Sequence, residues 1–202
     1  MKTFKCFILF LSVAALVLLS AETASAMKDA RRLSSEVFRL HVVAASDSDE
    51  DQALKLLVRD EILKETASLF NGAENAFDAA RVAKENAAVI ENAAKKVILE
   101  NGFDYGVRFS VESSYFPTKS YENDVNLPAG VYNALKVEIG DGSGKNWWCV
   151  LFPQICLSTS VSDASVKKDM LSPPSKELAE NKTKGARIKF KIIEIINGLF
   201  GR

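Results

Sequence analysis

The sequence contains a single histidine, His41, and this scarcity limits the chemistry that the protein can perform. A Ser-His-Asp or Cys-His arrangement would need His41 as its base, and a zinc site around it would need carboxylates alone as co-ligands. The chain contains no nucleophile elbow, and the glycine-rich loop at 140–144 is not followed by the Lys-Ser/Thr of a phosphate-binding loop. We interpret His41 as a packed or strand-edge residue, and we expect no catalytic residue, no cofactor and no metal site.

An excess of charge of either sign is also missing, because 26 Lys and Arg residues balance 26 Asp and Glu residues. Proteins that bind nucleic acid usually carry a basic excess on one face, so the balance argues against such a partner. The acids Asp47, Asp49 and Asp51 resemble the start of an EF-hand loop. Gln52 and Val58 stand where that loop needs glycine and glutamate, which argues against calcium binding.

Cysteine is scarce as well: the chain contains three cysteines, Cys6, Cys149 and Cys156. Cys6 lies in the N-terminal leader described below, so two cysteines remain, and a pair in an exported chain usually forms one disulfide. Residues seven positions apart on a straight strand point to opposite faces. A bridge from Cys149 to Cys156 therefore requires Pro153 to turn the chain, and two free buried thiols are the alternative.

One long apolar run is present, Cys6–Leu19, and it follows two lysines and precedes the small residues Ala24-Ser25-Ala26. This order of charged, apolar and small residues predicts a secretory signal peptide over residues 1–26. The run is shorter than the roughly 20 residues of a membrane-spanning helix, although an uncleaved N-terminal anchor is the alternative. In both cases the rest of the chain lies outside the cytoplasm.

The first part of the exported chain predicts a strand followed by a helix. Residues 27–35 are polar and indicate a spacer, and residues 37–44 are rich in β-branched side chains that favour a buried strand. Ser48, with Asp51 three residues later, is close to a capping box and predicts the start of a helix. Asn71-Gly72 should end that helix.

The rest of the domain adds a second helix and three strands. Small and apolar residues recur at helical spacing over 75–101, and the period then changes to two at 107–111 and 131–139. The run Asn146–Cys156, N-W-W-C-V-L-F-P-Q-I-C, contains a strand that is apolar on both faces, which we interpret as core. The turn at 140–144 predicts a hairpin between the last two strands.

This order predicts an α+β two-layer domain over residues 27–157, in which a helix pair covers one face of a largely antiparallel sheet. Residues 158–186 are polar and indicate a linker or long surface loop. Residues 187–202 form an amphipathic segment that fits a strand or a helix. We expect it to dock on the core, and contact with a membrane surface is the alternative.

Two polar features are candidate binding surfaces. Gln52, Lys55 and Arg59 share one face of the first predicted helix, with Asp60 beside them, and an ordinary solvated helix face is the alternative. The second feature is the loop Ser114–Tyr121, which carries several aromatic residues and one cation. Exposed aromatic residues suggest a surface that binds protein or sugar, unless the loop is pinned by its own aromatics.

Four segments in one order resemble the stage II sporulation protein R family of endospore-forming bacteria. They are R-L-H-V-V-A-A-S-D-S-D-E-D-Q-A-L-K-L-L-V-R-D (39–60), Y-F-P-T-K-S-Y (115–121), L-P-A-G-V-Y-N-A-L-K-V-E-I-G (127–140) and G-K-N-W-W-C-V-L-F-P-Q-I-C (144–156). The stretch N-W-W-C-V-L-F-P is the most specific of them. Ala45 and Gln154 depart from the family's pattern, which expects Asn and a second Pro, and this affects local turn geometry alone.

The resemblance implies a signalling protein that is not an enzyme. Family members are made in the forespore and exported into the space between the two sporulation membranes. There they trigger a membrane-embedded aspartic protease of the mother cell, which processes the inactive precursor of the early mother-cell sigma factor. A secreted hydrolase and a carbohydrate- or cell-wall-binding module are the alternatives.

We expect the exported domain to bind the outward-facing part of that protease. Membrane proximity through the C-terminal segment is the alternative to the docking of this segment on the core. The residues expected at the contact are Asp47, Asp51, Gln52, Lys55, Arg59, Asp60, Phe116, Lys119 and Tyr121.

Overall fold

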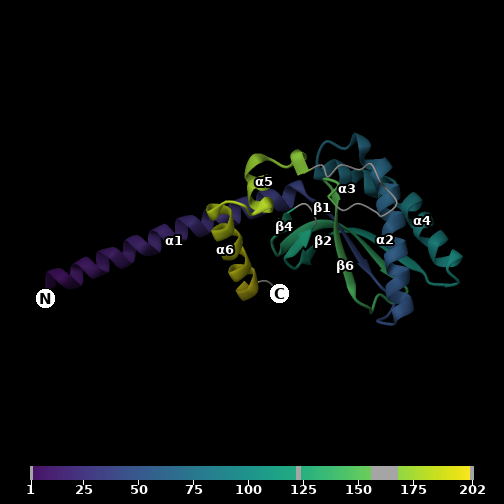
Figure 1. The fold of residues 1–202 in the computed structure, drawn as a ribbon, viewed down its shortest axis with the longest axis horizontal. Coiled ribbons are helices and arrows are strands. Elements are labelled where there is room, and N and C mark those ends of the chain that lie inside the picture. Colours follow the sequence, from purple (N-terminus) through teal and green to yellow (C-terminus); the bar gives the residue numbers. More distant parts are fainter. Residues whose placement is uncertain (1, 122–123, 156–167, 201–202) are drawn as a thin grey trace.

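The computed structural model describes residues 2–121, 124–155 and 168–200 (Figure 1). Within them, the main sheet has the strand order β2-β5-β1-β6, formed by β2 (Val107–Phe116), β5 (Gly130–Ile139), β1 (Phe38–Val43) and β6 (Asn146–Phe152). β1 runs parallel to β5, and the other two neighbouring pairs are antiparallel. Two short strands, β3 (Lys119–Tyr121) and β4 (Val125–Leu127), form a separate antiparallel pair. The predicted α+β class and largely antiparallel sheet are confirmed.

The predicted hairpin between the last two strands is wrong, because β1 lies between β5 and β6. The loop that joins them crosses the end of β1. Gly144 N donates to Ala44 O at 3.0 Å, and Ser143 Oγ donates to Ala45 O at 2.7 Å. A Cβ atom on Gly144 would lie 2.1 Å from the carbonyl oxygen of Ser46. Glycine is therefore required for the close passage of the loop over β1.

Helices α2 (Asp49–Leu69), α3 (Ala76–Glu85) and α4 (Ala87–Glu100) cover one face of the sheet, with the short 3-10 turn η1 (Phe70–Gly72) after α2 (Figure 1). Ser48 caps α2 as predicted, since its side chain accepts from Asp51 N at 3.2 Å. Apolar residues of the helices and the sheet form the first core, which includes Leu40, Val42, Leu54, Val58, Ile62, Ile90, Ala94, Ile98, Leu135 and Val137.

The second predicted helix is divided at Asn86. This residue has φ −106° and ψ 17°, and its side-chain Nδ2 donates to Val82 O at 2.9 Å. An asparagine side chain that bonds to the backbone of the preceding turn competes with helix continuation. After the break, Ile90, Ala94 and Ile98 are fully buried in the core. The helix pair of the prediction is thus a layer of three helices among the described residues.

The opposite face of the sheet is covered over one half by a second core. Here the C-terminal part of α1 (Lys2–Glu36) meets α5 (Pro173–Glu180) and α6 (Lys184–Phe200) (Figure 1). The predicted spacer at 27–35 is wrong, because these residues continue α1. Ala26, Ala30 and Leu33 recur at helical spacing and pack in this core, with Ala26 and Leu33 fully buried.

The predicted linker at 158–186 also contains helical structure in its described half, namely η2 (Lys168–Met170) and α5. α5 begins with Pro173, a residue favoured in the first helical turn, and it buries Leu178 and Ala179. The C-terminal segment is a helix, α6, which docks on the second core through Phe190 and Ile193. Residues 158–167 of the predicted linker lie outside the described residues.

The N-terminal half of α1 extends away from the body of the protein (Figure 1). Its residues from Cys6 onward have the length and composition of a helix that crosses a membrane, and a signal sequence has the same properties. The apolar side chains of this half are exposed to solvent in the structure. The finding is compatible with the predicted signal peptide and with the alternative of an uncleaved anchor.

Candidate functional site

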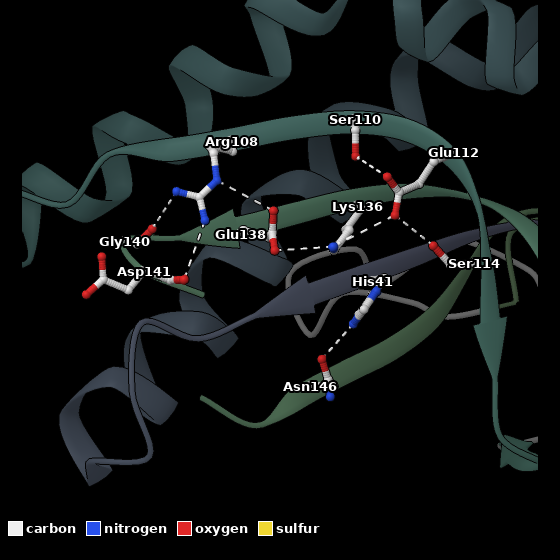
Figure 2. Close-up of polar contacts among 10 residues, drawn as sticks. All are labelled: His41, Arg108, Ser110, Glu112, Ser114, Lys136, Glu138, Gly140, Asp141 and Asn146. Atoms are coloured by element: carbon white, nitrogen blue, oxygen red, sulfur yellow. Dashed lines mark hydrogen bonds and ion pairs between the residues drawn. The ribbon is translucent and has the colours of Figure 1, made fainter. Parts of the chain in front are cut away.

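Beyond the second core, the second face of the sheet carries polar side chains that are exposed or half-buried, and Figure 2 shows their contacts. Successive residues of a strand point to opposite faces, and here the outward set is polar. The register places His41 of β1 opposite Lys136 of β5 and Lys136 opposite Ser110 of β2. We call this surface the polar sheet face; its residues are His41, Arg108, Glu112, Lys136, Glu138 and Asn146.

Ion pairs tie together the β2 and β5 side of the polar sheet face (Figure 2). Lys136 Nζ lies 3.2 Å from Glu138 Oε1 and 3.8 Å from Glu112 Oε1, and Arg108 Nε lies 3.6 Å from Glu138 Oε2. Hydrogen bonds donated by Ser114 and Ser110 hold the pKa of the Glu112 carboxyl below its ordinary value. The lowered pKa of Glu112 favours its ionised form, and Glu138 already pairs with Lys136 and Arg108. This argues against Glu112 as a carboxyl kept protonated for acid catalysis.

His41 occupies the middle of this face. Its Nε2 lies 2.7 Å from Asn146 Oδ1 (Figure 2). Its ring stacks on Trp148 with centroids 6.0 Å apart. Burial lowers the pKa of His41 below its ordinary value. Among the described residues, no group of three or more His, Cys, Asp and Glu side chains could hold a metal ion. The predicted role of His41 as a packed strand residue therefore fits its surroundings.

The edge strand β6 carries a tryptophan on each of its two faces. Trp147 packs partly against the first core and Trp148 against the second, and both remain half-buried. The Arg59 guanidinium carbon lies 4.5 Å from the centroid of Trp147, and Lys119 Nζ lies 5.1 Å from that of Trp148. We call these four residues the tryptophan edge. Tryptophan and arginine are the residues most enriched at the energetic centres of protein interfaces.

The tryptophan edge was not predicted, because the apolar composition of the run Asn146–Cys156 indicates core. The second half of β6 is indeed buried, but Asn146, Trp147 and Trp148 reach the surface. Two adjacent tryptophans must point to opposite faces of a strand, and a strand at the edge of a sheet leaves both partly uncovered. The pair itself was the available signal, and the strand order decided its exposure.

Most of the predicted contact residues near the start of α2 make hydrogen bonds within the protein. Gln52 Nε2 donates to Ser46 O at 2.8 Å. Lys55, which is 5% exposed, donates to Gln52 Oε1 at 2.6 Å and to Lys145 O at 3.0 Å. Asp47 accepts from Lys145 N at 2.8 Å. These bonds fasten the β1–α2 turn to the β5–β6 loop.

The remaining predicted helix residues divide between the interior and the surface. Asp51 is buried and accepts a hydrogen bond of 2.5 Å from Ser46 Oγ. Arg59 and Asp60 form an ion pair of 2.7 Å, and both side chains are partly exposed. Gln52, Lys55 and Arg59 are therefore not exposed together as one receptor surface, since Lys55 is buried.

The predicted aromatic loop is pinned around Arg39, which is fully buried near the start of β1. The Arg39 guanidinium carbon lies 4.0 Å from the Phe116 ring centroid and 4.8 Å from that of Tyr132. Arg39 also donates to the Tyr121 hydroxyl, and its Nε donates to Cys149 O at 3.3 Å. Phe116 and Tyr121 therefore enclose this guanidinium.

Lys119, which lies between these two aromatic residues in the chain, is half-buried and reaches Trp148. Of the three contact residues predicted in this segment, it is the one that belongs to the tryptophan edge.

The predicted disulfide is only partly described. Cys149 is buried on β6 and takes part in a disulfide, whereas Cys6 on α1 is an exposed free thiol. Cys156 lies outside the described residues, so the bridge between Cys149 and Cys156 stays a prediction.

Comparisons with known proteins connect this arrangement to one family. The family model described as "Stage II sporulation protein R" matches residues 34–162, which include every strand of the main sheet. The "Stage II sporulation protein R" of Bacillus subtilis (strain 168) is 30% identical over 217 aligned positions, which cover 96% of each chain. No solved structure matches the chain.

Proposed function

The chain belongs to the stage II sporulation protein R family, and from this we propose that it is an exported sporulation signal and not an enzyme. In this proposal it acts in the space between the forespore and mother-cell membranes. There it activates a membrane-embedded aspartic protease that processes the inactive precursor of the early mother-cell sigma factor. Gene expression in the mother cell is thereby coupled to gene expression in the forespore. The apolar N-terminal helix, which has the properties of a signal sequence, supports the export step.

The tryptophan edge is the observation that best supports a binding function. Its two indole rings and two cations come from β6, α2 and β3, and they wrap around a strand edge. Such a site can present aromatic surface and positive charge to a partner without any chemistry of its own. A protein that binds the active state of a receptor more tightly than the inactive state shifts the receptor towards activity. We place the protease contact here.

In this proposal, some of the predicted contact residues touch the protease and the others hold the contact surface in place. Arg59, Asp60 and Lys119 touch the protease directly, because their side chains are partly exposed beside the tryptophans. Asp47, Asp51, Gln52 and Lys55 act indirectly, through hydrogen bonds that hold the start of α2 and the β5–β6 loop in place. Phe116 and Tyr121 act in the same way, by fixing the chain on either side of Lys119 around Arg39.

α6 supports the proposed proximity to a membrane. Its buried side includes Phe190 and Ile193, whereas Ile188, Ile195 and Leu199 are 49%, 54% and 73% exposed. Basic residues of the same helix accompany this exposed apolar surface, and such a combination suits the surface of an anionic bilayer. The proposal is that α6 keeps the domain near the membrane in which the protease is embedded.

Co-production of the protease, its precursor substrate and this protein tests the function. Wild-type protein should give processed sigma factor, and the Arg59→Glu, Lys119→Glu double variant should lose most of it. The matched control is Lys95→Glu, Lys96→Glu, which makes the same change in charge on the exposed surface of α4. Processing without this protein would overturn the function, and equal processing by both double variants would overturn the site alone.

A cell-wall-binding module is the second candidate, because half-exposed tryptophans also bind sugars. The cations that lie over both rings leave less ring surface for a sugar, which favours the protein partner. A pull-down on purified peptidoglycan separates the two. Retention of wild-type protein together with loss of retention in Trp148→Ala would favour the sugar-binding candidate.

A further inference from the structure

β2 forms one edge of the main sheet, and it is long for an edge strand. All ten of its residues pair with β5 on one side, and no strand among the described residues pairs with it on the other. An edge strand offers a row of backbone N–H and C=O groups to another chain, and proteins usually cover or disrupt such edges. β2 contains no proline, and Arg108 and Glu112 are its two charged residues.

The positions of these two charges suit a second copy of the same strand. Arg108 and Glu112 lie on one face of β2, and their side chains are 60% and 42% exposed. If a second β2 pairs antiparallel around Ser110, each Arg108 lies opposite the Glu112 of the other copy, so the ion pair forms twice. Opposite charges across neighbouring strands stabilise pairing. Moving the register by two residues in either direction removes both ion pairs.

The other face of the strand supports the same register. A cleft of about 370 Å³ lies beside Val111 and Ser113, between β2 and α3, and Phe77 of α3 lines it with 76% of its surface exposed. In the paired arrangement, the half-buried Phe109 of the second copy lies opposite Val111, next to this cleft. Both faces of β2 therefore gain complementary neighbours, charged on one side and apolar on the other.

We propose that the protein forms a two-fold symmetric homodimer through antiparallel pairing of β2. The four-stranded sheets then join into one sheet of eight strands with Ser110 on the two-fold axis, and symmetric pairing of this kind closes without further growth. The polar sheet faces become continuous, and the two tryptophan edges lie at the outer ends. The inference is independent of the proposed function, because β6 takes no part in the pairing.

A cysteine at the two-fold axis tests the proposal in the full-length chain. In a Cys6→Ser background, which removes the exposed free thiol, Ser110→Cys should form a covalent dimer under mild oxidation. Ser113→Cys is the control, because the two copies of residue 113 lie roughly 20 Å apart in this register, beyond disulfide reach. Equal cross-linking of the two variants, or none in Ser110→Cys, would overturn the proposal.

Charge reversal then tests the register without depending on the stability of a single variant. In the Ser110→Cys background, Arg108→Glu and Glu112→Arg each place like charges opposite one another twice, and each should reduce the cross-linked fraction about tenfold. Co-production of the two variants restores both opposite-charge pairs, so cross-linking should return in the mixed dimer. A mixture that stays monomeric would overturn the pairing of Arg108 with Glu112.

Discussion

Gly144→Ala tests the observation that β1 lies between β5 and β6. The added Cβ would lie 2.1 Å from Ser46 O, and real Cβ atoms essentially never approach closer than 3.0 Å. Because the opposing atom belongs to the backbone, the loop itself must move by roughly 1 Å. Overpacking of this kind costs about 1–3 kcal/mol. A hairpin between β5 and β6 would instead leave Gly144 in an open turn, where alanine would be tolerated.

The displacement would also weaken the hydrogen bonds made at the end of the loop. Gly144 N bonds to Ala44 O at 3.0 Å, Lys145 N to Asp47 Oδ1 at 2.8 Å, and Lys55 Nζ to Lys145 O at 3.0 Å. Each contributes about 1 kcal/mol net. The free energy of unfolding should therefore fall by about 4 kcal/mol, a large part of the stability of an ordinary domain.

Urea unfolding followed by tryptophan fluorescence measures this loss, because Trp147 and Trp148 immediately follow the loop in β6. Gly106→Ala is the matched control, since nothing lies within 4 Å of a Cβ at that position. Its unfolding free energy should stay within about 0.5 kcal/mol of wild type. Equal stability of the two variants would refute the strand order in which β1 separates β5 from β6.

Three further predictions concern buried polar groups. Arg39→Met should keep the free energy of unfolding within about 1 kcal/mol of wild type, because it removes a buried charge and keeps most of the side-chain volume. Arg39→Ala should lower the free energy of unfolding by about 3 kcal/mol, because it leaves a cavity. Similar losses for the two variants in urea unfolding would contradict this. Burial lowers the pKa of His41, so an NMR titration of this single histidine should give a midpoint below 6.5. The unfolded chain then takes up the proton first as the pH falls, and stability should decrease below about pH 6.5 in wild type but less in His41→Gln. Lys55→Ala should lower the unfolding free energy by about 2 kcal/mol through unsatisfied acceptors, and the exposed Lys95→Ala by less than about 0.5 kcal/mol.

Local signals in the sequence predicted the helices and strands well, but they predicted less well which strands pair with one another. Ser48 caps α2, and Asn71-Gly72 lie in the 3-10 turn that follows this helix, as predicted. Both depend on interactions within a few residues. The hairpin prediction failed because turn residues show that a chain reverses direction but not which strand it then pairs with. A strand that is buried on both faces, as β1 is, is expected at the centre of a sheet. That burial is the one indication of the position that β1 takes between β5 and β6.

The candidate site was only partly predicted for a related reason. Helical spacing correctly placed Gln52, Lys55 and Arg59 on one side of α2, but spacing does not say what that side faces. The β5–β6 loop covers Lys55, and its Lys145 carbonyl is 90 positions away in the chain. The same limitation applies to Trp148, whose position at the sheet edge could not be inferred from an apolar run.

The sequence by itself determined the α+β class, the leader-like N-terminus, the start of α2 and the family, because these depend on short-range patterns and on specific motifs such as N-W-W-C-V-L-F-P. The tertiary structure decided which polar residues are buried and which are available to a partner. Arg39 bonds to Cys149 across 110 positions and His41 to Asn146 across 105. Burial is set by such distant neighbours, so one pattern of residues can serve either as core or as surface until the strand order is known.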